Sequence, residues 1–422
     1  MHAQTTLRGV GDLPGGADLS EVFALSADGS TAVGHSDVGG SLFVRFYAAT
    51  AWTESSQLVA ILDGMEAGMT ATAYGVSTNG QTIVGAADYG LFSPFGRPAF
   101  YRDGESGAVI EFGDLPGGVS GVPTATARGV SGDGRFVVGI GQSDNGTEAF
   151  EYDIATAQFT PLGDLAGGDF ASYAYGISND ASVIFGVVTG PAGERQAALW
   201  GPTRQLQPLG WMPTAAGVVR FSTAEAASTD GSVIVGASRS LNSPNGGEAY
   251  RWTVEEGMQG LGDLPGGHFQ SIAYGVSGDG RVVVGRANIE GVPGPFGGGS
   301  APRAFIWTQQ TGMRDLQVVL QTEHGVDLGD WTLEEARGIS ADGRAIAGNG
   351  RHADTGVVEG WVVRFDVACP AGIDGDGAVG LQDLALLLSN FGQFASTGDL
   401  DADGDVDLQD LANLLSAFGA TC

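Results

Sequence analysis

The sequence predicts an all-β seven-bladed β-propeller followed by a small α-helical module with paired EF-hand-type loops. Two observations predict the propeller: a Ser-x-Asp-Gly turn or a close variant occurs seven times, and four short β-strands can be read in each repeat. A third observation predicts the module, because a different, aspartate-rich motif occurs twice after residue 366. We therefore expect two domains, residues 1–366 and residues 367–422.

The propeller repeat is marked by a serine that returns about every 50 residues. Its positions are Ser26, Ser77, Ser131, Ser178, Ser228, Ser277 and Ser340, at intervals of 51, 54, 47, 50, 49 and 63 residues. A unit of this size cannot bury its apolar face alone and must stack on its neighbours. Seven stacked units favour a closed ring.

Each repeat contains the same segments in the same order. An apolar run ending in glycine follows the turn, as in Phe136–Gly139, and an alternating aromatic segment comes next, as in Ala149–Tyr152. The repeat closes on a segment such as Phe112–Gly118, which reads FGDLPGG. Asp-Gly between two β-branched runs is a strong hairpin signal, because both residues tolerate the positive φ of a tight turn. Four-stranded sheets repeated around an axis form a propeller.

The two ends of the array predict how the ring closes. Residues 5–16 already carry the Gly-Asp-Leu-Pro-Gly-Gly segment, whereas the seventh repeat stops after Trp361-Val362-Val363 without it. We expect the N-terminal strand to complete the seventh blade, which leaves no unpaired strand edge at the seam.

These repeats resemble the HAF-repeat family of secreted bacterial proteins over residues 7–365. The likeness rests on Gly-Asp-Leu-Pro-Gly-Gly, Gly-Val-Ser-x-Asp-Gly, Val-Val-Gly and Ala-Phe-x-Trp. The family's histidine before Ala-Phe is absent, so no role that depends on it transfers; its place is taken by Pro98, Glu148, Gln196, Glu248, Arg303 and Glu359. The turns also resemble those of TolB-like propellers, which concerns the hairpin and not an activity.

The strongly negative charge of the chain limits the kinds of molecule that it is expected to bind. The net charge is −30, the sequence pI is about 4.2 and the 19 basic residues are all arginines. A chain with this negative charge is not expected to bind nucleic acid or anionic lipid. Calcium, cationic surfaces or neutral polysaccharide are better candidate partners. No apolar run is long enough for a membrane span, and no signal peptide precedes the first strand.

The second acidic motif has the spacing of an EF-hand calcium loop. Loop positions 1, 3, 5, 7, 9 and 12 are filled by Asp399, Asp401, Asp403, Asp405, Asp407 and Asp410, with Gly404 at position 6. Calcium takes six to eight oxygen ligands, and the glycine allows the sharp turn that points them inward. The sequence therefore predicts a Ca²⁺ site in this loop.

The first acidic motif is a weaker version of the second. Residues 373–392 match residues 400–419 at 14 of 20 positions, but Gly372 and Gly380 stand at positions 1 and 9. Asp374, Asp376 and Asp383, with the carbonyl of Ala378, remain as candidate ligands. Each loop runs into a helix, and we expect Leu384, Leu388, Leu411 and Leu415 to pack between the two helices.

Paired calcium loops that each lead into one helix resemble a dockerin domain, of the planctomycete type proposed to hold exported proteins at the cell surface. The resemblance implies a cohesin-like or other scaffold partner. The Ser-Thr pairs with which cellulosomal dockerins bind cohesin are replaced by Leu381-Gln382 and Leu408-Gln409, which argues against a standard cohesin. The two cysteines, Cys369 and Cys422, bracket the module, and a disulfide between them implies an oxidising compartment.

No established catalytic motif is present. The sequence has no metalloprotease, phosphate-loop, nucleophile-elbow or Cys-x-x-Cys signature, and without lysine it excludes Schiff-base chemistry. The Asp of the Gly-Asp-Leu-Pro-Gly-Gly segment can bond nearby backbone amides, or it can form part of a carboxylate ring near the channel. Aromatic residues of the loops 86–97 and 286–303 can either anchor those loops or stack on sugar rings.

These observations lead to one functional expectation and one alternative. We expect an extracellular or cell-surface, non-catalytic protein for binding or display, attached to its scaffold by the calcium-binding module and with polysaccharide as a candidate ligand of the propeller face. The alternative is a polysaccharide-degrading glycoside hydrolase or lyase carried by the same module, since two suitably placed carboxylates suffice for glycoside hydrolysis.

Overall fold

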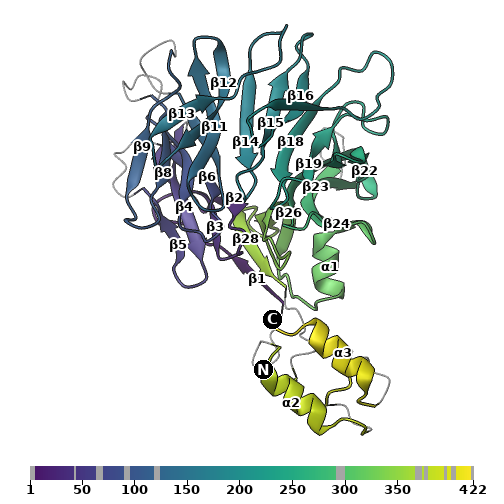
Figure 1. Ribbon diagram of the computed structural model, residues 1–422. Coiled ribbons are helices and arrows are strands. Elements are labelled where there is room, and N and C mark those ends of the chain that lie inside the picture. The colour runs from purple at the N-terminus through teal and green to yellow at the C-terminus, as the bar shows by residue number, and fades with distance from the viewer. Residues whose placement is uncertain are drawn as a thin grey trace. The chain divides into compact units, whose positions relative to one another are not determined.

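The computed structural model describes residues 5–41, 44–62, 70–89, 96–117, 124–290, 300–365, 373–374, 379–393, 397–400 and 405–419. The chain divides into two compact units, one formed by Leu7–Val363 and the other by Met1–Thr6 with Arg364–Cys422. The first unit contains seven four-stranded sheets. They are arranged as blades around a common axis (Figure 1), so the predicted seven-bladed β-propeller is confirmed.

Six blades use four consecutive strands each, with the first strand innermost. Blades one to three are β2 (Ser20–Leu25), β3 (Thr31–Ser41), β4 (Val44–Thr53), β5 (Gln57–Ala60); β6 (Thr70–Val76), β7 (Ile83–Asp88), β8 (Ala99–Arg102), β9 (Val109–Phe112); and β10 (Thr126–Val130), β11 (Phe136–Ser143), β12 (Gly146–Asp153), β13 (Gln158–Pro161). Blades four to six are β14 (Ser172–Ile177), β15 (Ile184–Thr189), β16 (Arg195–Trp200), β17 (Leu206–Gly210); β18 (Ser222–Ala227), β19 (Ile234–Ser238), β20 (Glu248–Thr253), β21 (Gly257–Gly260); and β22 (Gly266–Val276), β23 (Val282–Glu290), β24 (Ser300–Thr308), β25 (Gly312–Asp315).

The seventh blade joins the two ends of the array. It contains β26 (Trp331–Ile339), β27 (Ala345–His352) and β28 (Val358–Arg364), with β1 (Thr6–Gly9) as its outermost strand. Just beyond β1, the Val10 amide donates to the Gly360 carbonyl at 2.9 Å. The predicted closure by the N-terminal strand is thus confirmed.

A serine that is hydrogen-bonded to an aspartate or asparagine holds the hairpin turn of each repeat. In blade three the Ser131 hydroxyl donates to Asp133 Oδ1 at 2.5 Å and accepts from the Phe136 amide at 2.9 Å. The corresponding hydroxyl donates to Asp or Asn at 2.6–3.0 Å in the other six blades. All seven serines are buried, so these bonds explain why the turn motif recurs.

Replacing Ser131 by Ala should lower the free energy of unfolding by about 1–3 kcal/mol, because the substitution leaves the part-buried Phe136 amide and a carboxylate oxygen of Asp133 without this partner. Guanidinium unfolding followed by tryptophan fluorescence measures the change. The exposed Ser106 offers a control, and an equal effect of Ser106→Ala would contradict the role of the buried turn.

The glycine that ends each apolar run is required by a carbonyl of the inner strand, which an added Cβ would approach to 1.8–2.1 Å in every blade. A Cβ atom on Gly139 would collide with the Thr126 carbonyl and lie 2.9 Å from Phe150 Cζ. Phe150 is fully buried, and Gly139 is its partner across the ladder between β11 and β12. The motif therefore reflects the close approach of the inner strand, to which an aromatic ring adds in the blades of Gly85, Gly139, Gly285 and Gly348.

The apolar cores lie between blades. One buried cluster combines Val84 and Tyr101 of blade two with Val137 and Phe150 of blade three. Another combines Val10, beside β1, with Val22 and Trp52 of blade one and Val362 of blade seven. Because each core needs two neighbouring blades, no single blade has a core of its own.

A belt of backbone hydrogen bonds links the hairpin turns at one end of the inner strands. Seven N–H···O bonds of 2.7–3.2 Å connect each blade to the next, with no gap between the first and the last. The belt is formed by Asp28 to Thr78, Thr78 to Gly132, Gly132 to Asn179, Asp180 to Thr229, Thr229 to Gly278, Gly278 to Ala341 and Ala341 to Ala27, donor first. The ring is closed here as well as through β1.

The propeller unit also contains a helix that the strand pattern did not predict. Helix α1 (Leu316–Thr322) follows β25 in the longest interval between turn serines. Its N-cap Asp315 accepts from the Gln317 amide at 2.8 Å, and Leu316 and Leu320 are fully buried. The i, i+4 spacing of these leucines is a helical signal, but seven residues are too few for it to stand out in a strand-rich sequence.

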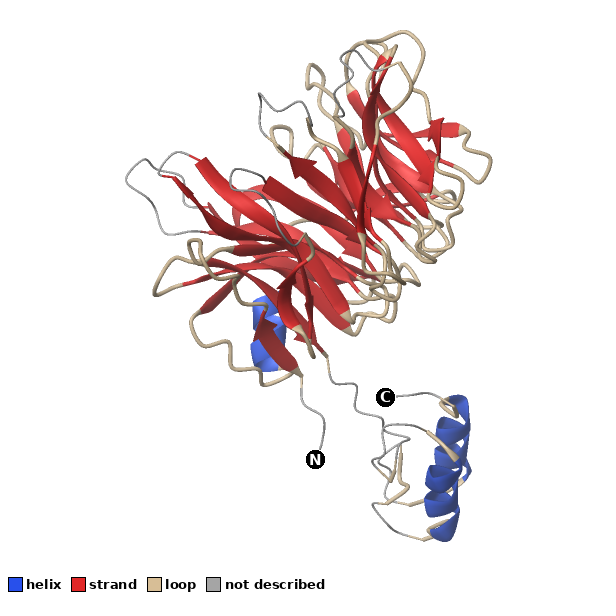
Figure 2. Cartoon of the chain, turned by 90° about the vertical axis from the view of Figure 1, so that its left-hand side faces the viewer, coloured by secondary structure: helices blue, strands red, loops and turns tan. Residues whose placement is uncertain are grey.

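The C-terminal unit contains two short helices, α2 (Leu381–Ser389) and α3 (Leu408–Ser416). They lie against each other (Figure 2) around a core of Val379, Leu387, Val406 and Leu414. The Gly392 amide donates to the Val406 carbonyl at 2.7 Å, and the Gly419 amide donates to the Val379 carbonyl at 2.8 Å. Each loop is therefore bonded to the end of the other helix in an equivalent way.

The expected packing of the helices was half wrong. Leu384 and Leu411 contact the core, but Leu388 and Leu415 are 52% and 53% exposed. The core of this unit is small, so only one side of each helix is buried. Leu387 and Leu414 lie on that side and are fully buried there.

Candidate functional sites

A β-bulge occurs at one position in the inner strand of every blade. In blade three the pairing of β10 with β11 shifts register between Ala127 and Gly129, so Arg128 is the extra residue. A bulge bends the strand and turns a side chain away from the regular alternation. The extra residues are Phe23, Tyr74, Arg128, Tyr175, Glu225, Tyr274 and Arg337.

These seven side chains, which we call the bulge ring, line a central cavity of about 460 Å³. All seven are partly exposed. The residue directly before each turn serine also lines the cavity and is aliphatic, as at Val130. This volume lies within the range of about 300–1,000 Å³ that is usual for small-molecule sites.

Charged and aromatic side chains alternate through most of the bulge ring. The guanidinium carbon of Arg128 lies 4.4 Å from the centre of the Tyr74 ring, and that of Arg337 lies 4.2 Å from the centre of the Tyr274 ring. Arg337 Nε donates to Glu335 Oε1 at 2.9 Å. The aromatic rings thus hold the guanidinium groups in place at the cavity wall.

Glu225 is the one carboxylate among the described residues that line this cavity. Burial raises its pKa, while a hydrogen bond with Thr223 and the positive charges of Arg337 and Arg128 oppose the shift without cancelling it. Burial likewise raises the pKa of Tyr175. The cavity therefore contains a carboxyl group that keeps its proton to higher pH than an ordinary glutamate.

The bulge ring is not apparent from the repeat motif. Its signal was present, because all seven residues stand three positions before the turn serine. The residue at that position differs between repeats, so it is not part of the common motif. The regular alternation of a strand also does not reveal a bulge that turns this side chain into the channel.

The recurring Asp of the Gly-Asp-Leu-Pro-Gly-Gly segment has a structural role. Asp114 Oδ1 accepts from the amides of Leu115 and Gln142, each at 2.8 Å, and its Oδ2 accepts from Thr124. Asp164 and Asp263 also accept from amides of the following blade. None of these three lines the cavity. For these three copies the first of the two readings, bonding to backbone amides, is confirmed, and they do not form a ring of carboxylates at the described cavity wall.

The first copy of this segment gives a pH-dependent prediction. Burial and the nearby Glu359 raise the pKa of Asp12 from its ordinary value of 3.8 to about 6. The folded state then binds this proton more tightly than the unfolded state, so the contribution to stability falls as pH rises towards 6 and beyond. Asp12→Asn should therefore raise the melting temperature more at pH 8 than at pH 4.5, relative to the unsubstituted protein. Thermal melts at both pH values test this, and an equal gain at both would contradict it.

The two long loops are described only in part. Tyr89 donates to Glu111, whereas Phe92, Phe95 and Phe296 lie outside the described residues. The proposed sugar-stacking role of these loops stays a prediction.

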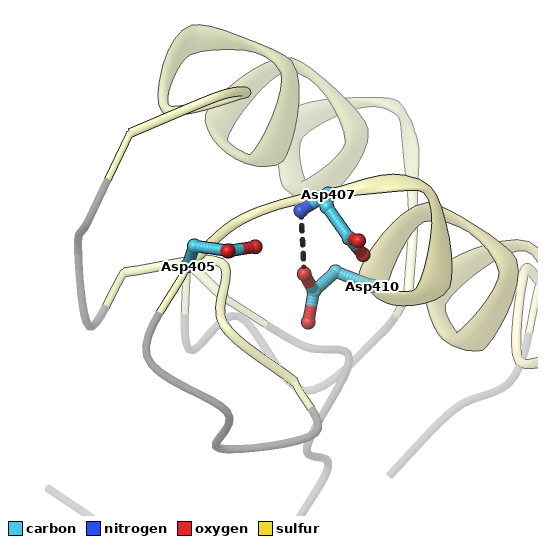
Figure 3. A group of neighbouring side chains, drawn as sticks. All are labelled: Asp405, Asp407 and Asp410. Carbon is cyan, nitrogen blue, oxygen red and sulfur yellow. Dashed lines mark hydrogen bonds between the residues drawn. The ribbon is translucent and has the colours of Figure 1, made fainter.

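The second acidic loop brings three carboxylates together (Figure 3). One oxygen from each of Asp405, Asp407 and Asp410 lies within 4.8 Å of the other two. Asp410 is fully buried, and it accepts from the Leu400 amide at 2.5 Å and from the Asp407 amide at 2.7 Å. These bonds place the position-12 carboxylate beside the loop. Of the remaining predicted ligands, Asp399 is described, and Asp401 and Asp403 lie outside the described residues.

The first acidic loop repeats the same scaffold with fewer acids. Asp383 is buried and accepts from the Gly380 amide at 2.7 Å and the Asp374 amide at 3.0 Å. Asp376 and Ala378 lie outside the described residues. The position-9 amide thus binds the position-12 carboxylate in both loops, while the second amide comes from position 3 in the first loop and from position 2 in the second.

The predicted disulfide stays a prediction, because Cys369 and Cys422 both lie outside the described residues. Helices α1, α2 and α3 have seven to nine residues each, and no helix in the described part of the chain is long and apolar enough to cross a membrane.

No family model and no curated protein matches the chain. Similar solved structures include oligogalacturonate lyase from Vibrio parahaemolyticus, at 12% identity and a TM-score of 0.49, covering 86% of this chain and 98% of that one. They also include TolB from Acinetobacter baumannii (11%, TM-score 0.40, 76% of each chain) and the β-propeller domain of the Trilobed protease from Pyrococcus furiosus (10%, TM-score 0.47, 86% and 94%). Likeness at this level does not indicate an activity.

Proposed function

We propose that this chain is a non-catalytic binding or display protein of the extracellular space or cell surface, held on a scaffold partner by its C-terminal dockerin-like module when calcium is bound. The observation that carries the proposal is the convergence of Asp405, Asp407 and Asp410 at the start of α3. Their sequence spacing, the glycine at position 6 and the following helix agree with a calcium loop.

The donor set fits calcium. It consists of carboxylate oxygens, which hard divalent cations prefer, and residues 367–422 hold nine aspartates and no arginine or histidine. Without a cation these aspartates repel one another around a thin core. In the second loop Asp399, Asp401, Asp403 and Asp410 would hold the ion, with Asp405 and Asp407 beside it; in the first loop Asp374, Asp376, Asp383 and the Ala378 carbonyl would do so.

The helices present an apolar surface that suits a protein partner. Leu381 and Leu408, the first residues of α2 and α3, are 77% and 71% exposed. Leu388 and Leu415 are exposed on the same two helices. Several exposed leucines on two packed helices favour an interaction surface over singly scattered apolar residues, which need no partner. They replace the polar recognition pairs of cellulosomal dockerins, so the partner we propose has an apolar docking site.

The described cavity wall does not offer the pair of carboxyl groups that the glycoside-hydrolase form of the alternative needs. Glycoside hydrolysis requires two carboxyl groups on either side of the bond, and the described cavity wall contributes Glu225 alone. We expect no reducing-end release from common plant or marine polysaccharides. Release that is abolished by Glu225→Gln would overturn the non-catalytic assignment.

Surface attachment can be tested in the cells that produce the protein. We expect the chain in the surface fraction, released into the medium by EGTA and retained when calcium is restored. An Asp383→Asn/Asp410→Asn double variant should be released without EGTA. Asp354→Asn makes the same kind of substitution at an exposed position of the propeller, and this control should stay attached. Retention of the double variant in EGTA would contradict calcium-dependent attachment.

A further inference from the structure

We propose that the central cavity binds a sugar acid, meaning a hydroxylated ring with one carboxylate, through Arg128 and the aromatic side chains of the bulge ring. The proposal deepens the proposed function, since it names the ligand class of the binding propeller. It rests on four features of the cavity wall: a cation whose buried Nε has no hydrogen-bond partner among the described residues, a second cation, a carboxyl group and several aromatic rings.

Arg128 supplies the anion-binding group. Its Nε is buried and has no hydrogen-bond partner among the described residues, and its positive charge acts on Glu225 only through space. Its guanidinium stacks on Tyr74 and faces the cavity. A guanidinium binds a carboxylate through parallel hydrogen bonds, which makes a carboxylate the natural partner for this group.

Arg337 and Glu225 indicate that the ligand has polar groups besides its carboxylate. Arg337 already donates to Glu335, so its charge is partly satisfied, but the guanidinium still lines the cavity between Tyr274 and Phe23. Glu225 is two blades from each arginine along the chain order of the ring. A ligand with a carboxylate at Arg128 therefore needs neutral hydrogen-bonding groups, such as hydroxyls, to satisfy Glu225.

The aromatic residues supply the surface for a ring. Phe23, Tyr74, Tyr175 and Tyr274 contribute four rings at one level of the cavity. Sugar rings have apolar C–H faces that pack on aromatic side chains, and tyrosine hydroxyls add hydrogen bonds at the ring edge. Carboxylate, hydroxyls and an apolar ring face together describe a sugar acid.

The positive groups of the cavity contrast with the acidic character of the rest of the protein. The chain carries a net charge of −30, yet two of its 19 arginines point into one cavity of about 460 Å³. An acidic exterior repels anions over a distance of about a Debye length. A carboxylate ligand therefore has to be bound by local contacts inside the cavity and not by the overall field.

Calorimetric titration of the full chain with D-glucuronate, D-galacturonate, D-glucose and benzoate tests the proposal. We expect at least one uronate to bind, glucose to bind at least tenfold more weakly for lack of the carboxylate, and benzoate to bind more weakly than that uronate for lack of hydroxyls. Arg128→Gln should weaken uronate binding by about tenfold or more, the usual effect of losing a charge-assisted hydrogen bond. Tyr175→Ala should weaken it as well by removing ring contact.

Arg220→Gln is the matched control, because Arg220 also stacks on an aromatic ring, Trp211, but is exposed and does not line the cavity. It should leave uronate binding within about twofold. Circular dichroism confirms that each variant is folded. No uronate binding, equal binding of glucose or benzoate, or unchanged binding by folded Arg128→Gln would each overturn the proposal. Calcium binding by the C-terminal module is measured separately and is unaffected by any of these outcomes.

Discussion

Deleting residues 1–16 should cause the largest loss of stability of any change in the propeller. The deletion removes β1 and Val10, which is 3% exposed and packs with Val22, Trp52 and Val362 across the seam between blades seven and one. It also removes the hydrogen bonds from Val10 to the Gly360 carbonyl and from Gly11 to Glu359. Lost burial and lost bonds together should lower the free energy of unfolding by about 3 kcal/mol or more. Differential scanning calorimetry should show one transition at a lower temperature.

A point variant keeps this prediction testable if the deletion does not fold. Val10→Asp leaves the chain length unchanged and places a charge in the same apolar seam, which should destabilise the protein by a similar amount. Thr6→Asp is the control, because Thr6 lies on β1 with its side chain exposed. An unchanged melting transition for both the deletion and Val10→Asp would show that the seam is not needed for stability.

Asp410→Asn should have the largest effect on calcium binding. The substitution removes the position-12 charge from a fully buried site and replaces one of the oxygens that accept the Leu400 and Asp407 amides with an amide nitrogen. Because calcium affinity follows the number of charged ligands, the second loop should lose roughly two orders of magnitude in affinity. The two loops share one core, so binding at the first loop should also weaken.

Calcium titration of the full chain, by calorimetry and by far-ultraviolet circular dichroism, measures both effects. In the unsubstituted protein the second loop should fill first, since Gly372 stands at position 1 of the first loop. Asp354→Asn again serves as the control at an exposed position. Two equal and independent sites, or no calcium binding, would refute the assignment of the loops.

The propeller could be predicted from the sequence because its signals are local and are repeated seven times. Ser131 and Asp133 bond to each other and to neighbouring amides, so the motif and the turn correspond directly. The closing strand was predictable for the same reason, since a segment present at the start was missing at the end. The acidic loops were found from spacing alone, and the structure brings Asp405, Asp407 and Asp410 together.

Features that depend on long-range geometry could not be predicted in this way. Whether Arg128 points into a channel depends on a register shift between two strands and on six other blades. The choice between Leu387 and Leu388 as the buried residue depends on where the opposite loop crosses the helix, which periodicity does not specify.

The belt of peptide groups at the hairpin turns determines how a molecule can reach the cavity. Its seven bonds are made by the backbone, so side-chain substitutions leave its diameter unchanged, and widening it would require several peptide bonds to separate from their neighbours together. That end of the channel is therefore a ring of nearly fixed width, so the backbone determines the size of what can pass through it. The chemistry of the cavity beside it is determined by the bulge ring, whose side chains differ from blade to blade.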